Sequence, residues 1–503
     1  MGANHSKSPL PNEKLVIERL RAMEIKESDD YVQVDEKALA GSSKTKFRAP
    51  WIALSVSEVE HWEHQLLQDP KNRLALSALS SADPKSVLTS RSTTIRDQQI
   101  FNIKIPFEGA PITNQRQSGR CWLFASTNVF RVALMKRHNL DKFELSQAYL
   151  FFYDKLEKAN FFLEQILDTA SDELDTRTVQ TLLQSPVGDG GQWDMVYNLV
   201  HKYGLVPQVL YPDSFNAQAS NAINTLITTK LREDALQLRA LATSGTKSSK
   251  EIANIKDKMI REVHLILTLT LGPPPSPTTE FTWNYLDKNG APQQLKTTPV
   301  AFSKELSSPK SIRLTNSTVH DMFSLVNDPR NEYNTLLTVD RLGNIVGGRG
   351  ITYVNVSMDT MKEACIKMLQ AGLPIFFGSD VGKYSNSSSG IMDTSLIDYE
   401  LGFNVRLGMS KAQRLMVGES AMTHAMVLTA VHVEDGKSVR WRVQNSWGEG
   451  AGTDGWFVMS DKWMDEFTYQ AVVEPRFVSK EIRDILTSEP KVLPLWDPMG
   501  ALA

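Results

Sequence analysis

The sequence contains few cysteines and no long apolar run. Only Cys121 and Cys365 occur in 503 residues, too few for the disulfide framework of a secreted peptidase and consistent with a reducing compartment. There is no apolar run of about 18 residues, the length that would span a membrane. The first residues also lack the apolar core of a secretory signal. We therefore expect a cytoplasmic protein without a membrane span.

Neither sign of charge dominates the chain. Lys and Arg total 55 against 58 for Asp and Glu, which gives a net charge of −3. This balance provides no overall attraction to nucleic acid or to an anionic membrane. Residues Met1–Ser6 fit the short N-myristoylation pattern. Because one acyl chain binds membranes only marginally, we expect no stable membrane association.

The segment around Cys121 has the pattern of a cysteine nucleophile. Polar, turn-forming residues from Thr113 to Gly119 precede a run from Cys121 to Lys136 that is apolar on nearly every face, as in a buried helix. At a helix N-terminus, unpaired N–H groups and the macrodipole lower a thiol pKa. Gln115 adds an amide donor for an oxyanion. A lone cysteine at such a place is usually a packed hydrophobe, so this segment alone does not establish chemistry.

A predicted hairpin in the second half of the chain supplies a histidine and an asparagine. Residues 423–431 have the pattern of a strand, Asp435-Gly436 that of a turn, and 439–445 that of a returning strand. Antiparallel pairing about this turn brings His424 and Asn445 roughly opposite each other. An Asn amide that orients a His beside a Cys is the arrangement of a cysteine hydrolase. Trp447 follows closely enough to shield that hydrogen bond from water.

These motifs resemble the papain-type cysteine peptidases. The order Gln115, Cys121, His424, Asn445 matches that family, although Ser118 stands where secreted members have a second cysteine and His424 follows Cys121 by 303 residues, about twice the usual span. Four longer segments resemble the bleomycin hydrolase branch of the family. They are Glu144–Lys155, Asp189–Trp193, Leu325–Arg330 and Trp496–Ala503.

The resemblance implies a fold and an activity. The expected fold is α+β, a papain-like pair of lobes, one helical and one β-rich, with a helical insertion and an extended C-terminal arm. The expected activity is that of a cysteine aminopeptidase that acts on peptides with a free N-terminus and on amide analogues such as bleomycin. The branch also implies a homohexamer and neither a metal nor another cofactor.

The resemblance also assigns roles to individual residues. Cys121 would be the nucleophile, His424 the proton carrier, Asn445 its orienting partner and Gln115 an oxyanion donor. Gly190 and Gly191 would pair with the substrate main chain, although paired glycines also mark plain turns. Trp447 would contribute to the substrate site. The Ala503 carboxylate would lie near Cys121, where it blocks long upstream segments and receives the substrate ammonium group.

The expected organisation has five parts. We predict a mobile N-terminal arm over 1–50, the helical lobe over 51–221, the insertion over 222–272, the β-rich lobe over 273–475 and the C-terminal arm over 476–503. A helix opened by Ser57, with Glu60 three residues on, is expected over 57–79. Cys365, in an amphipathic pattern over 361–368, is interpreted as packing.

Two other functional classes remain open at this stage. Between 225 and 265 the insertion carries eight basic and five acidic residues, typical of a solvated helical hairpin. A contact between subunits or with nucleic acid is the alternative. A catalytically idle scaffold and a cysteine-dependent amide transferase are the competing functions, since the sequence does not show which nucleophile ends the reaction.

Overall fold

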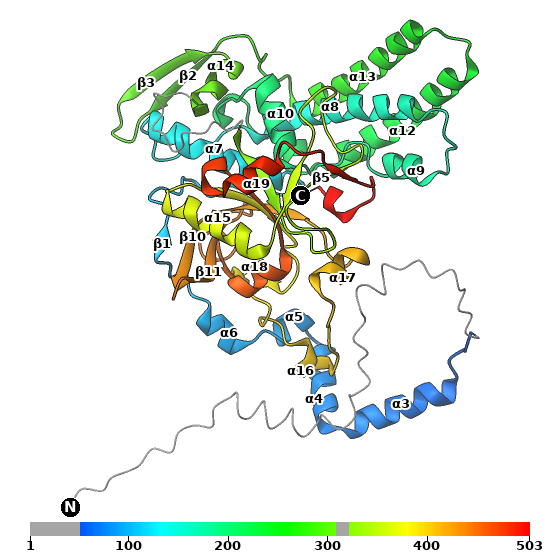
Figure 1. The fold of residues 1–503 in the computed structure, drawn as a ribbon, viewed down its shortest axis with the longest axis vertical. Helices are drawn as coiled ribbons and strands as arrows, with labels where there is room; N and C mark the ends of the chain where they lie inside the picture. Colours follow the sequence, from blue (N-terminus) through cyan, green and yellow to red (C-terminus); the bar gives the residue numbers. More distant parts are fainter. Residues whose placement is uncertain (1–50, 308–320, 503) are drawn as a thin grey trace, which may run out of the picture. The chain divides into compact units, whose positions relative to one another are not determined.

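The protein was studied as a computed structural model, which describes residues 51–307 and 321–502 (Figure 1). The chain divides into two compact units, Met1–Trp62 and Glu63–Ala503. The predicted N-terminal arm, Gly2 of the myristoylation pattern and Ala503 lie outside the described residues. No described helix is both long and apolar enough to cross a membrane.

In the first unit, the described residues lead into α3 (Val56–Gln68). The helix begins one residue earlier than predicted, because Ser55 and Glu58 form the capping contacts expected of Ser57 and Glu60. The Ser55 hydroxyl accepts from the Glu58 N–H at 3.2 Å, and the Glu58 carboxylate accepts from the Ser55 N–H at 3.2 Å. The predicted single helix is also wrong at Pro70, where a second helix starts behind the N-cap Asp69.

In the second unit, the chain from 63 to 307 is largely helical. The helix α7 begins at Cys121, as the sequence predicts. Ser146 and Thr176 are the N-caps of α8 and α9. The elements are α4 (Pro70–Leu79), α5 (Pro84–Val87), α6 (Arg91–Arg96), α7 (Cys121–Arg137), α8 (Gln147–Asp168), α9 (Arg177–Gln184), α10 (Trp193–Tyr203), η1 (Gln208–Leu210), α11 (Phe215–Gln218), α12 (Asn221–Ser244), α13 (Ser249–Leu271), α14 (Pro299–Ser303) and η2 (Lys304–Ser307).

The predicted insertion is a helical hairpin of α12 and α13. Gly245 ends α12 in the left-handed conformation, at φ 62°, and Ser248 opens α13 with a capping box. In Figure 1 both helices lie beside α8, against which they pack. Most basic side chains of the hairpin have intramolecular partners: Lys230, Arg232, Arg239, Lys247, Lys256 and Arg261. This pairing favours the interpretation of a solvated hairpin over that of a nucleic-acid surface.

The later part of the unit is built on a sheet, which has twelve strands in the part of the chain that is described. Its order is β14-β5-β6-β4-β13-β7-β10-β11-β12-β9-β8, with β1 paired to β10. The strands are β1 (Ile103–Lys104), β4 (Phe323–Val326), β5 (Thr335–Val339), β6 (Tyr353–Asn355), β7 (Ile375–Ser379), β8 (Ser385–Asn386), β9 (Ile391–Met392), β10 (His424–Glu434), β11 (Lys437–Gln444), β12 (Trp456–Ser460), β13 (Thr468–Val473) and β14 (Lys491–Leu493). The strands β2 (Phe281–Leu286) and β3 (Pro292–Thr297) pair separately.

Short helices accompany this sheet. They are α15 (Met358–Gln370), α16 (Tyr399–Phe403), α17 (Lys411–Met416), α18 (Asp461–Phe467), η4 (Pro475–Phe477), α19 (Lys480–Ile485) and η5 (Pro498–Gly500). Cys365 in α15 is fully buried, as expected of a packing residue. The predicted hairpin is present as β10 and β11, joined at Asp435-Gly436.

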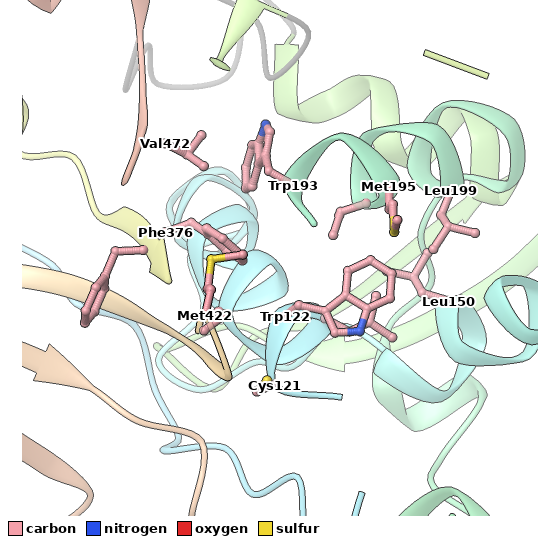
Figure 2. Close-up of a cluster of buried hydrophobic side chains, with 14 of the residues drawn as sticks. Cys121, Trp122, Leu150, Trp193, Met195, Leu199, Phe376, Met422 and Val472 are labelled. Carbon is pink, nitrogen blue, oxygen red and sulfur yellow. The ribbon is translucent and has the colours of Figure 1, made fainter. Parts of the chain in front are cut away.

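One hydrophobic core joins the helical and β-rich parts. Figure 2 shows Cys121 at the start of α7, with Trp122, Trp193, Phe376 and Met422 among the buried side chains around it. Trp193 comes from α10 and Phe376 from β7, and their rings lie 5.5 Å apart. The nucleophile candidate therefore sits where the two parts of the fold meet.

Candidate active site

The histidine and asparagine predicted from the hairpin lie in contact. His424 Nε2 and Asn445 Oδ1 are 2.9 Å apart, and both residues are buried. Asn445 Oδ1 also accepts from the Ser446 N–H at 2.8 Å. Because an amide oxygen only accepts, Nε2 carries the ring proton and Nδ1 is left as the basic nitrogen. The Trp447 ring lies 4.9 Å from the imidazole, which shields this hydrogen bond from solvent.

The exact pairing of the hairpin differs from the prediction. Val427 pairs with Gln444, and register shifts occur near Leu428 and His432. His424 pairs instead with Ser379 of β7. The asparagine reaches the histidine from just beyond the end of β11, so the side chains meet although their backbones are not directly opposite.

Cys121 is brought against the strand that carries His424. The thiol is 2% exposed, and the Ala425 N–H, one residue after His424, hydrogen-bonds to it. Burial raises the pKa of the Cys121 thiol to about 11, against the N–H groups of Ala425, Trp122 and Cys121, which lower it. The helix terminus was expected to lower the pKa of Cys121. The pKa is raised instead, because the effect of burial is larger.

The histidine responds to the same burial in the opposite direction. Burial lowers the pKa of His424 to about 4, although the hydrogen bond with Asn445 raises it. Both shifts disfavour charge, since a low dielectric penalises a thiolate and an imidazolium alike. Burial therefore acts on both groups in the direction that disfavours charge.

Gln115 lies on a loop bound to the segment that carries Asn445. Its backbone N–H donates to Ser446 O at 2.8 Å, and the Gly448 N–H donates to Thr113 O at 3.0 Å. The Gln115 side-chain amide donates to Ser118 O at 2.7 Å. An amide nitrogen carries two N–H groups, so a second donor is available for an oxyanion.

The predicted glycine pair packs on the residue that follows the nucleophile. A Cβ at Gly191 would lie 2.6 Å from the Trp122 indole, so only glycine fits there. The Trp122 indole N–H also donates to Asp189 O at 2.7 Å. The Gly190 carbonyl accepts from Lys158 Nζ at 2.6 Å.

Sequence reasoning missed the charges that hold this loop. Lys155 and Lys158 of α8 are buried beneath residues 187–190; Lys155 pairs with Asp189 at 2.6 Å and Lys158 with Asp154 at 2.7 Å. Asp189 also accepts from the Gly119 N–H at 2.9 Å, two residues before Cys121. Burial would raise the pKa of Asp189, but Lys155 and hydrogen bonds from Ser220 and Gly119 hold it well below its usual range. A pair of lysines three residues apart in an apolar helix was the available signal.

The C-terminal segment contacts β5, Arg330, Arg177 and Gln192. β14 pairs in parallel with β5, and Arg330 bridges Asp328 and Asp497, both at 2.8 Å. The Arg177 guanidinium lies 4.1 Å from the Trp496 ring. The Gln192 side chain donates to Ala501 O at 2.6 Å. Ala503 itself lies outside the described residues, so the predicted position of its carboxylate is untested.

The described residues contain no group of three His, Cys, Asp or Glu side chains arranged to hold a metal ion.

Comparisons with known proteins identify the family of the chain. The model of the Peptidase C1-like family matches residues 53–500. Human bleomycin hydrolase is 43% identical over 448 residues, which cover 87% of this chain and 96% of that protein. Cysteine proteinase 1, mitochondrial, of Saccharomyces cerevisiae is 41% identical over 91% of this chain and 96% of its own length.

A solved structure supports the same assignment. The crystal structure of PepW from Lactobacillus rhamnosis superposes with a TM-score of 0.84 at 39% identity, over 90% of this chain and 99% of that one. The α+β, papain-like fold expected from the sequence is thus confirmed. The chain belongs to the Peptidase C1-like family, as a cysteine peptidase similar to bleomycin hydrolase.

Proposed function

We propose that the chain is a cysteine aminopeptidase that works through Cys121, His424 and Asn445. The Cys121 sulfur attacks the carbonyl carbon of the first peptide bond, and its proton passes to His424 Nδ1. The imidazolium returns that proton to the leaving amine as the C–N bond breaks. Water, deprotonated by the same nitrogen, then releases the acyl group and restores the thiol.

The observation that carries this mechanism is the His424–Asn445 hydrogen bond. It fixes the proton on Nε2 and the ring orientation, which leaves Nδ1 as the base. Because burial disfavours charge on both groups, we assign the transfer of the thiol proton to the same step as the attack. Gln115 and the Cys121 backbone N–H are the donors that we assign to the oxyanion.

Selection of a free N-terminus is assigned to the C-terminal segment. Its docking next to Gly190 and Gly191 would fill the side that long upstream residues of a substrate would occupy. In our proposal the Ala503 carboxylate faces the substrate ammonium group, and a charge-assisted hydrogen bond favours the free amine. Trp447 completes the substrate site beside His424.

The experiment compares fluorogenic amino-acid amides with the same amides carrying an N-acetyl group. The full chain should cleave the free-amine substrates preferentially, and a chain that ends at Met499 should lose this preference and accept N-acetylated or internal bonds. An unchanged preference in the shortened chain would contradict the role of the C-terminal segment. Bleomycin, as an amide analogue, is assayed in the same series.

The two competing functions have distinct outcomes in the same assay. A transferase would form the acylated product of an added amine faster than free acid, whereas a peptidase forms free acid in excess amine. A scaffold would show no turnover that depends on Cys121. The intact His424–Asn445 contact favours the enzyme.

We also propose that the chain forms a homohexamer through its helical insertion. Leu226, Leu236, Leu265 and Leu269 are each more than half exposed on α12 and α13, and apolar side chains grouped on one hairpin mark a contact surface. Sedimentation equilibrium should give the hexamer, and a concentration-independent monomer would refute it. Any binding to DNA should weaken steeply with salt, since phosphate contacts release counterions.

Cytoplasmic location stays a prediction for this chain. The yeast relative carries the word mitochondrial in its name, so fractionation of cells that express the protein should include both compartments. Recovery with mitochondria would contradict the prediction.

A further inference from the structure

We propose that Gln192 is a positioning residue that fixes the C-terminal segment relative to the nucleophile and so sets the preference for a free N-terminus. This inference rests on the proposed aminopeptidase function. Gln192 stands directly after the glycine pair and is fully buried. Its Nε2 donates to Ala501 O at 2.6 Å, across 309 residues of sequence.

A short series of contacts leads from the nucleophile to this hydrogen bond. Trp122 adjoins Cys121, and its indole lies against Gly191 so closely that a Cβ there would approach to 2.6 Å. The indole N–H is held by Asp189 O at 2.7 Å. Gln192 is the next residue after Gly191. Two contacts therefore connect Ala501 to the start of α7: the hydrogen bond from Gln192, and the packing of Gly191 on Trp122.

The loop that carries Gln192 is itself held from beneath. Lys158 Nζ donates to Gly188 O at 3.0 Å and to Gly190 O at 2.6 Å, and Lys155 Nζ donates to Val187 O. Three backbone carbonyls are thereby bound by two buried ammonium groups. Movement of the loop would remove these carbonyl acceptors from both ammonium groups and Asp189 from Lys155, which is costly in a low dielectric. Gln192 is thus presented on a fixed support.

Gln192 provides a hydrogen bond close to the end of the described chain. The bridge from Arg330 to Asp497 lies four residues before Ala501, and the turn at Pro498–Gly500 is closed by Asp497 within the segment itself. Beyond Ala501, Leu502 packs on the main core. Loss of the Gln192 contact would let residues 501–503 move, and each residue of extended chain spans up to about 3.5 Å. Such movement is enough to displace a carboxylate from an ammonium group.

The test combines Gln192→Leu with removal of the segment that it holds. Four proteins are compared: the full chain, Q192L, the chain ending at Met499, and Q192L in that shortened chain. A matched control is Gln147→Leu, which removes another buried glutamine amide that donates to Thr127 Oγ1 at 3.0 Å. For each protein, kcat and KM are measured on free-amine and N-acetylated amides.

In the full chain, Q192L should lower the free-amine to N-acetyl ratio of kcat/KM by about 2- to 10-fold, the range of one lost hydrogen bond. The change should appear mainly as a higher KM for the free amine. In the shortened chain Q192L should have no effect on the ratio, because the partner is gone. Q147L should leave the ratio unchanged.

The possible results distinguish the role of Gln192 from the proposed aminopeptidase function. If shortening the chain changes the ratio but Q192L does not, the role of Gln192 is wrong and the aminopeptidase proposal stands. If Q192L lowers the ratio equally in both backgrounds, its effect is on folding or on the loop, and the inference is again wrong. If shortening leaves the ratio unchanged, the proposed role of the C-terminal segment is overturned, and that of Gln192 with it.

Discussion

Replacement of Lys158 by methionine tests whether buried charge supports the active site. Lys158 is buried, pairs with Asp154 at 2.7 Å, and donates to two carbonyls of the loop that packs on Trp122. Methionine preserves much of the apolar stem but removes the ammonium group. Asp154, which is fully buried, then lacks its cation, and the carbonyls of Gly188 and Gly190 lose a donor.

The expected cost follows from these contacts. Removal of one partner from a buried ion pair costs about 3–5 kcal/mol, because the remaining charge is uncompensated. Burial already raises the pKa of Asp154, against the effect of Lys158. The K158M protein should therefore regain part of its stability at low pH, where Asp154 becomes protonated. The second change Asp154→Asn should restore part of the loss at neutral pH.

The assay is urea unfolding followed by tryptophan fluorescence, together with kcat/KM on a free-amine amide. Lys367→Met is the matched control, since Lys367 pairs with Glu363 at the same i,i+4 spacing in α15 but the two side chains are 48% and 66% exposed. An exposed pair of this kind contributes about 0–1 kcal/mol. K158M should also lower kcat/KM about 10-fold or more, since small displacements of positioning groups reduce rates strongly.

A loss of stability in K158M no larger than that in K367M would refute the reasoning. So would a K158M/D154N protein as unstable as K158M alone at neutral pH. Either result would mean that the loop is held by packing and that its buried charges are incidental.

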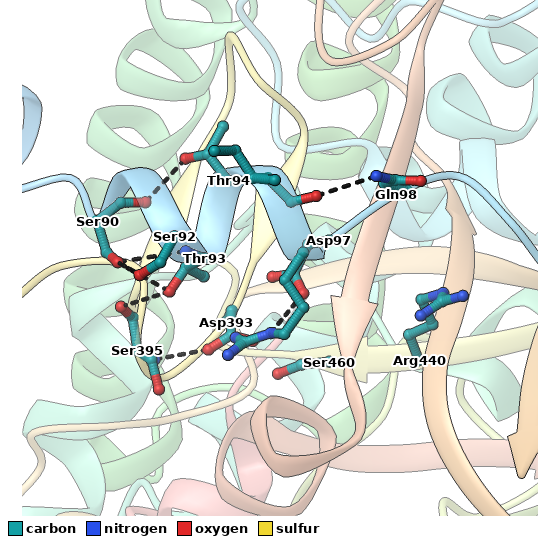
Figure 3. A network of polar contacts seen from close by, with 12 residues as sticks. Ser90, Ser92, Thr93, Thr94, Asp97, Gln98, Asp393, Ser395, Arg440 and Ser460 are labelled. Atoms are coloured by element: carbon teal, nitrogen blue, oxygen red, sulfur yellow. Dashed lines mark hydrogen bonds and ion pairs between the residues drawn. The ribbon is translucent and has the colours of Figure 1, made fainter. Parts of the chain in front are cut away.

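Three further outcomes are expected. A thiol-directed epoxide should label Cys121 and spare the buried Cys365, and Cys121→Ala should abolish turnover; labelling of Cys365, followed by peptide mass spectrometry, would contradict the assignment. Gln115→Ala should lower kcat by about 10²- to 10³-fold, the usual effect of one lost oxyanion donor, and an unchanged kcat would remove it from the mechanism. Asp97 shares Arg96 with Asp393 (Figure 3), and burial, followed by the charge of Asp393, raises its pKa to about 6. Because the folded pKa is raised, Asp97 destabilises the fold increasingly as pH rises from about 4 through 6. Asp97→Asn should therefore be more stable than the parent protein at pH 7, by about 1 kcal/mol after allowance for solvent screening. Equal urea midpoints for the two proteins at pH 7 would contradict this.

Local chemistry made much of the fold predictable. The turn at Asp435-Gly436 and the strands on either side follow from residue pattern, and Gly245 marks the break in the insertion. The N-cap of α3 shows the limit of such patterns: Ser55 and Ser57 each precede an acidic residue by three positions, so the sequence does not distinguish them, and Ser55 is the one that forms the contacts.

In the candidate site, too, contacts within one hairpin were predictable and contacts between distant segments were not. His424 and Asn445 are linked by one hairpin, so spacing alone brought them together despite two register shifts. The contact between Gln192 and Ala501 spans 309 residues, more than half of the chain, and has no local sequence pattern. The direction of the Cys121 pKa shift could not be read from the sequence: a helix terminus is visible there, whereas the burial that raises this pKa depends on segments far apart in the chain.

The closure of the helical insertion suggests a place for attaching probes. The chain leaves toward α12 and returns from α13 at points tied together, since Tyr211 donates to Gly272 O at 2.7 Å and Asn216 to Thr270 O at 3.4 Å. The opposite end of the hairpin, residues 243–250, is exposed. Lengthening a loop there adds only about 0.6 kcal/mol per doubling. A fluorescent label or affinity peptide inserted after Gly245 would thus leave both chain termini free and the stem of the hairpin closed.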